Sequence, residues 1–213
     1  MYKPSIVLKA VAAALLASTA GQPLAATEIP QNPEKNLYFG ETHMHTAYSL
    51  DAFLGGTRQT PGDAYRFARG ETVVVNGQPH QMRRPLDFAA VTDHAEYLGE
   101  MYAAMHPGTP GHDNPQIQQL ISLTDFDERR QWFIEYVVKA GRGAGGRRHT
   151  PFYPGEAVVT NGWKILTDAA ARYNEPGVFT TFNAYEWSAA PGGANLHRNV
   201  IFRGDAVPEL PMS

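Results

Sequence analysis

The chain has no cysteine among its 213 residues. Disulfide bonds and thiolate metal sites are therefore excluded, so a bound metal would need nitrogen or oxygen ligands. An excess of one charge is also missing, because 18 basic and 21 acidic side chains give a formal net charge of −3. This balance lacks the electrostatic footprint of a protein that binds nucleic acid or an anionic membrane surface. We therefore expect neither nucleic acid nor an acidic lipid surface as a partner.

A hydrophobic run long enough to cross a membrane is missing as well. The alanine-rich stretch at residues 10–20 follows Lys3 and Lys9 and ends in small residues. It has about half of the ~20 apolar residues that a membrane-spanning helix needs. This order is typical of a secretory signal peptide, here predicted at residues 1–26 with cleavage after Ala20 or Ala26. We expect an exported, periplasmic or secreted protein without a membrane span after cleavage; an uncleaved anchor is the alternative.

Predicted strands and helices alternate along the rest of the chain. The apolar patterns predict strands at residues 36–43, 86–92, 178–186 and 195–202, and helices at residues 61–69, 115–139 and 161–173. An Asn-Gly pair predicts a β-hairpin at residues 73–78, and the Gly-, Pro- and His-rich residues 101–114 indicate a loop. Such alternation favours an α/β fold with a parallel sheet, open or closed into a barrel. Because no helix follows the last strand, we expect the domain to be incomplete at its C-terminus.

Two histidines stand at the end of the first predicted strand. His43 and His45 are two residues apart, so their side chains are expected on the same face of the strand. Two imidazoles that converge in this way can chelate one cation. Asp51 follows in the next segment, near enough in sequence to supply an oxygen ligand.

Acid and base residues also mark the other strands. Asp93 and His94 follow the strand at residues 86–92 and should face opposite ways, which assigns His94 to a metal and Asp93 to orienting an imidazole. Glu186 ends a predicted strand, and His197 lies at the start of another. Each alone has a structural alternative, such as an ion pair for Glu186. Their concentration at the carboxyl ends of strands, where α/β folds place their sites, favours a metal centre.

These motifs resemble the PHP domain, the polymerase and histidinol phosphatase superfamily of metal-dependent hydrolases. Its first motif is His-x-His followed by Ser and Asp, its second is Thr-Asp-His, and its third is a glutamate with a histidine on the next strand. The corresponding residues here are His43-Met44-His45 with Ser49 and Asp51, then Thr92-Asp93-His94, then Glu186 and His197. The similarity covers residues 36–205 and is closest to a secreted PHP-like group that carries a domain of unknown function.

The resemblance implies the N-terminal part of a distorted (β/α) barrel, with a helical insertion at about residues 101–175. It implies metal ligation by His43, His45, Asp51, His94, Glu186 and His197, with Glu186 as a bridge, and catalytic roles for Asp93, His94 and Glu186. The cofactors would be two or three divalent ions of zinc, manganese or iron. The family's further histidine and its terminal Asp-x-His have no counterpart before Ser213.

The implied activity is hydrolysis of a small, phosphorylated molecule by metal-activated water. Two alternatives stay open. Related metal barrels hydrolyse C–N or C–O bonds with similar ligands, and a chain that lacks the later ligands could be a non-catalytic metal-binding fragment of a larger protein.

Overall fold

The computed structural model describes residues 32–139, 149–191 and 194–213. The predicted signal peptide at residues 1–26 lies outside the described residues, so export stays a prediction. Among the helices of the described part, none has both the length and the apolar character required to cross a membrane.

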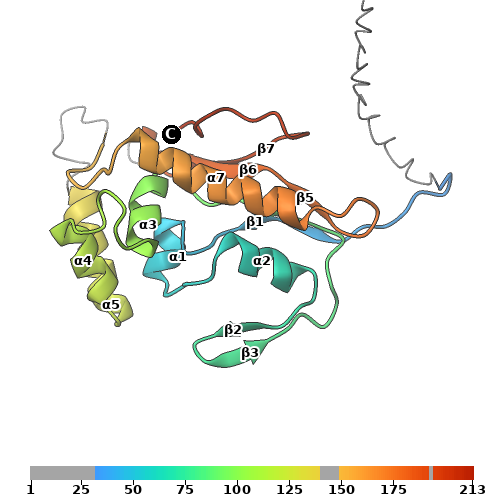
Figure 1. Ribbon diagram of the computed structural model, residues 1–213, viewed down its shortest axis with the longest axis horizontal. Coiled ribbons are helices and arrows are strands. Elements are labelled where there is room, and N and C mark those ends of the chain that lie inside the picture. The colour runs from blue at the N-terminus through green and yellow to red at the C-terminus, as the bar shows by residue number, and fades with distance from the viewer. Residues whose placement is uncertain (1–31, 140–148, 192–193) are drawn as a thin grey trace, which may run out of the picture. The chain divides into compact units, whose positions relative to one another are not determined.

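The chain combines helices with a small parallel sheet, which confirms the predicted α/β class, although strands and helices do not strictly alternate along the chain (Figure 1). In chain order the elements are β1 (Gly40–Met44), α1 (Leu50–Leu54), α2 (Pro61–Ala68), β2 (Val73–Val75), β3 (Gln78–His80), β4 (Phe88–Val91), α3 (Leu98–Met105), α4 (Pro115–Ser122), α5 (Phe126–Phe133), the π-helical segment η1 (Ile134–Val138), α7 (Glu156–Tyr173), β5 (Thr180–Phe182), β6 (Ala184–Ala189) and β7 (Leu196–Ile201).

The central sheet has the strand order β1-β4-β5, and both pairings are parallel. Strand β4 lies in the middle, and its residues Ala89, Ala90 and Val91 are buried, as a strand covered on both faces should be. The register of β1 against β4 shifts between Glu41 and Met44, so β1 contains one extra residue there. Such a bulge bends a strand and re-aims its side chains, and here it lies beside His43. Within the described residues this sheet has three strands and does not close into a barrel.

Helices α2 and α7 cover one face of the sheet. Tyr65 of α2, Ala170 of α7 and Phe179 pack with Ala89 and Val91 in one buried cluster. The Tyr65 hydroxyl accepts a hydrogen bond from the backbone N–H of Val91 at 3.2 Å, which ties helix α2 to the central strand. Helix α2 begins as its sequence predicts, because Thr60 and Asp63 form a capping box around Pro61.

Three sequence-based boundaries need correction. Residues 101–105 are not loop but the end of helix α3, because Met101, Ala103 and Ala104 are buried in the core and the glycine- and proline-rich turns begin only after them. Helix α7 begins at Glu156 rather than at residue 161. The single strand predicted at residues 178–186 is divided at Asn183 into β5, in the parallel sheet, and β6, which pairs antiparallel with β7. The hairpin β2–β3 and the helices after residue 115 are confirmed.

Candidate metal centre

The chain brings strand ends from two sheets together at one place. The carboxyl ends of β1 and β4 lie side by side in the parallel sheet, and His94 is the third residue after β4. Strand β6 runs past this edge, where Glu186 forms a parallel bridge with His94. The backbone N–H of Glu186 donates to Asp93 O, and the N–H of Ala95 donates to Glu186 O. The sequence indicated that Glu186 ends a strand, but in the structure Glu186 lies inside β6.

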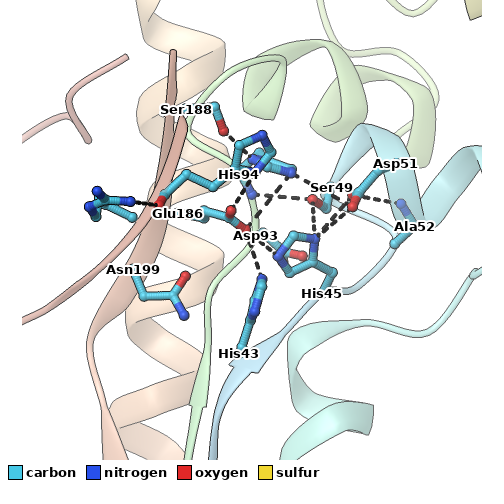
Figure 2. Close-up of polar contacts among 12 residues, drawn as sticks. His43, His45, Ser49, Asp51, Ala52, Asp93, His94, Glu186, Ser188 and Asn199 are labelled. Atoms are coloured by element: carbon cyan, nitrogen blue, oxygen red, sulfur yellow. Dashed lines mark hydrogen bonds and ion pairs between the residues drawn. The ribbon is translucent and has the colours of Figure 1, made fainter. Parts of the chain in front are cut away.

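Glu186 is the centre of the cluster, and its side chain is only 1% exposed. Its Oε2 atom lies 3.0 Å from His43 Nε2, 2.7 Å from His45 Nε2 and 3.9 Å from His94 Nε2. Its Oε1 atom lies 2.5 Å from His197 Nδ1. Figure 2 shows the imidazoles of His43, His45 and His94 turned toward this carboxylate. Four histidines from three regions of the sequence thus surround one buried carboxylate.

Asp51 stands on the opposite side of His45 from Glu186. Its Oδ2 atom is 3.0 Å from His45 Nδ1 and 3.7 Å from His94 Nε2. Each nitrogen of the His45 ring therefore faces a different carboxylate (Figure 2). All six predicted ligand residues come together here. They form three overlapping groups whose ligand atoms lie within 4.8 Å of one another: His43, His45 and Glu186; His45, Asp51 and His94; and His94, Glu186 and His197.

The cluster pairs negative carboxylates with imidazoles. Burial by itself raises the pKa of Glu186, but the neighbouring charge of His94 and hydrogen bonding from His43 and His197 outweigh burial, so the pKa is lowered. Burial likewise opposes ionisation of Asp51, yet contacts with His45 and His94 hold its pKa well below the usual range. Both acids are thus kept as carboxylates, the form that binds a cation.

One buried atom supports the fit of these residues to a metal ion. His45 Nε2 is buried and lies 2.7 Å from Glu186 Oε2, yet the two atoms are not oriented to form a hydrogen bond, so the nitrogen has no hydrogen-bond partner. A buried polar atom without a partner costs roughly 1–3 kcal/mol. A cation that accepts lone pairs from both atoms would remove that cost. Imidazole and carboxylate ligands suit zinc, manganese and iron.

Three residues hold the histidines in position: Ser49, which belongs to the first motif, and Ser188 and Glu96, to which the sequence analysis gave no role. Ser188 Oγ lies 2.8 Å from His94 Nδ1, which leaves His94 Nε2 facing the carboxylates. Ser49 Oγ lies 3.1 Å from His45 Nδ1 and accepts the backbone N–H of His94 at 3.2 Å. Glu96 accepts the backbone N–H of Ser188 at 3.1 Å. The available signal for Ser188 was its position two residues after Glu186, which places both side chains on one face of a strand.

Asp93 has another environment from the one expected. It is fully buried, and its carboxylate accepts hydrogen bonds from the backbone N–H and the hydroxyl of Thr46 rather than from an imidazole. Burial raises the pKa of Asp93 to about 6. Asp93 was expected to face away from His94. Its side chain contacts the segment that follows His45. Its contacts therefore fix the loop that carries His45.

A mixed α/β fold with overlapping histidine and carboxylate groups beside its parallel strand ends defines a candidate metal-binding protein with nitrogen and oxygen ligands. The chain belongs to the family described as "Protein of unknown function (DUF3604)", whose profile matches residues 32–213. Comparison with curated proteins and with solved structures found no match. The matched range contains every residue of the cluster, and the function has to be argued from that cluster.

Proposed function

We propose that this chain carries the metal centre of a metal-dependent hydrolase of the PHP type. The observation that carries the proposal is the buried Glu186 carboxylate, which presents Oε2 to His43 and His45 and Oε1 to His197. A carboxylate with histidines at both oxygens is suited to bridge two cations. Paired ions that hold the attacking and the leaving oxygen are a recurrent arrangement for hydrolysis.

The orientation of the rings favours two ions among the two or three implied by the resemblance. His94 Nδ1 is occupied by Ser188, so only Nε2 is free to bind a metal. The two groups that include His94 therefore compete for one nitrogen. In the arrangement that gives each histidine to a single ion, one ion would be held by His43, His45 and Glu186, and the other by Glu186, His94 and His197. Asp51 would then accept a hydrogen bond from His45 Nδ1 and orient that ring, a common role for a carboxylate beside a ligand histidine.

The chemistry follows from these roles. Bound divalent ions supply Lewis acidity and lower the pKa of water toward neutrality. The chain's own residues fix the ligand geometry: Asp51 and Ser49 hold His45, and Ser188 holds His94. Asp93 keeps the loop after β1 in place through Thr46.

For the substrate we propose a small phosphoester, and for the location an exported protein. The phosphoester assignment is supported by the resemblance to PHP domains. Hydrolysis of a C–N or C–O bond is the second candidate, favoured by the same ligand set. A non-catalytic metal-binding fragment is the third.

A substrate panel separates these candidates. Purified chain with added Mn²⁺ or Zn²⁺ is assayed against aryl phosphates and phosphodiesters, and in parallel against amides and carboxylic esters. We expect chelator-sensitive release of phosphate or alcohol from the phosphorus esters. Turnover of the amides or esters alone would favour the second candidate. Metal binding without turnover of any substrate would contradict catalysis by this chain.

Metal affinity is expected to fall in acid. Burial lowers the pKa of His45, but its hydrogen bond to Asp51 and the nearby carboxylates outweigh burial and raise the pKa above 6.5. A proton that is held more tightly must leave before the metal binds, so protonation of His45 competes with metal binding at and below this raised pKa. For one released proton, affinity should drop about tenfold per pH unit below the pKa of His45. Titration of Zn²⁺ by calorimetry between pH 8 and about 5.5 measures this slope, and a flat profile would contradict the assignment.

A further inference from the structure

A polar cavity lies apart from the metal centre, and none of the six cluster residues lines it. It has a volume of about 340 Å³ and lies between the segment after α1, the β2–β3 turn and the start of α5. Its walls include Gly56, Thr57, Asn76, Thr124 and Arg129. Sites for small molecules span about 300–1,000 Å³, so the cavity suits a small ligand. With Val75 as the one large apolar side chain among its lining residues, that ligand should be polar.

Arg129 is buried at the wall of this cavity, with 8% of the residue exposed. Its Nε donates to Leu54 O at 2.6 Å, and its Nη1 donates to Leu123 O at 3.3 Å and Thr124 O at 3.0 Å. Within the described residues, Nη2 makes no hydrogen bond and Arg129 makes no ion pair. This nitrogen lies toward Gly56, where a Cβ atom would come within 3.4 Å of it. The backbone carbonyls thus fix the guanidinium and leave one of its edges for a ligand.

A second guanidinium, that of Arg58, belongs to the same segment as Thr57 and Gln59 of the wall, although Arg58 itself does not line the cavity. Arg58 donates to Phe53 O at 2.9 Å and Thr57 O at 2.7 Å, and it stacks on the Phe53 ring. It too has no carboxylate partner among the residues that the structure describes. Partial burial, and after it the neighbouring charge of Arg129, lower the pKa of Arg58. Unpaired cations with little exposure are costly unless a counter-charge is supplied.

We propose that this cavity is a binding site for an oxyanion, such as a phosphate or sulfate group, held by Arg129 Nη2 and the polar groups of the wall. A guanidinium matches the geometry of such groups better than other cations do. The anion would supply the counter-charge that Arg129 lacks. The group is either a free anion or part of a small organic molecule. This proposal does not depend on the proposed hydrolase function.

The test adds a negative charge to the cavity wall without changing the fold. Asn76 is exposed in the β2–β3 turn with a φ of 51°, a conformation that Asp tolerates as Asn does. Asn76→Asp should weaken binding of inorganic phosphate, measured by calorimetry, at least about tenfold. Asn161→Asp, an equal charge change at an exposed position of α7 outside the cavity, should leave binding unchanged. A thermal melt of each variant without phosphate reports whether the fold is kept.

A further variant separates this site from the metal centre. His43→Ala/His45→Ala should retain phosphate binding, because neither histidine lines the cavity. In that variant, tighter binding of methylphosphonate than of phosphate would identify an organic phosphate as the occupant, and equal or weaker binding would identify the free anion. Loss of phosphate binding in the histidine variant together with full binding in Asn76→Asp would overturn the proposal. So would the absence of phosphate binding to the unaltered chain at millimolar concentration.

Discussion

Glu186→Gln is expected to reduce metal-dependent hydrolysis by about a thousandfold or more. The substitution keeps the shape of the side chain but removes the negative charge that both histidine groups share. Stabilisation of transition-state charge by bound ions is worth several kcal/mol, and each 1.36 kcal/mol corresponds to about tenfold in rate. Steady-state kinetics at saturating Mn²⁺ with the best substrate of the panel measures the effect.

The matched control is Glu209→Gln, which makes the same chemical change at an exposed residue outside the cluster. It should retain the activity of the unaltered chain. If Glu186→Gln also kept activity within a factor of about three, its glutamate would have no part in a catalytic metal centre.

Asp93→Ala is expected to be the most destabilising single change near the cluster. It removes two buried hydrogen bonds to Thr46 and leaves the Thr46 N–H without a partner. Hydrogen bonds to charged groups contribute about 1.5–3 kcal/mol each, and an unsatisfied buried group costs about 1–3 kcal/mol, so a loss of about 3 kcal/mol follows. For a chain of this size that corresponds to a fall in Tm of roughly 6–12 °C.

Thermal unfolding followed by circular dichroism, with chelator present, measures this loss without a contribution from metal. Asp205→Ala, at an exposed aspartate, is the control and should melt with the unaltered chain. A Tm for Asp93→Ala within about 2 °C of the control would show that the Thr46 contacts do not hold the loop.

The sequence alone could predict that the candidate metal ligands converge, because the direction of each side chain along a strand depends only on its position in that strand. Alternation of side chains places His43 and His45 on one face, and the parallel pairing of β1 with β4 brings His94 to the same edge. These inferences need only the period of a strand and the order of the chain.

The strand pairing that positions Glu186 could not be predicted in this way. A continuous apolar run hid the break at Asn183, where the chain leaves the parallel sheet and pairs with β7 instead. Which strands pair depends on contacts between distant residues, and a run of apolar residues does not contain that information. Ser188, on the same strand, was missed for the same reason, since its partner His94 is 94 residues away.

The hydrogen-bond partner of Asp93 shows a second limit of prediction from the sequence. The sequence showed that Asp93 faces away from His94 but not what lies on that side. The Thr46 N–H and hydroxyl fill that space because the segment after β1 continues alongside the end of β4, which brings Thr46 next to Asp93. Helix α3 shows a different limit: its Met and Ala residues favour a helix, but the Gly-, Pro- and His-rich turns that follow concealed where the helix ends.

The central claim is that this cluster of histidines and carboxylates binds metal ions, and metal content tests it most directly. The chain is loaded with Zn²⁺ or Mn²⁺, passed through a desalting column and analysed by plasma mass spectrometry, beside His43→Ala/His45→Ala and the exposed-site control His80→Ala. We expect about two ions per chain in the unaltered protein and in His80→Ala, and a loss of at least one ion in the double variant. Equal metal content in all three proteins would contradict the account.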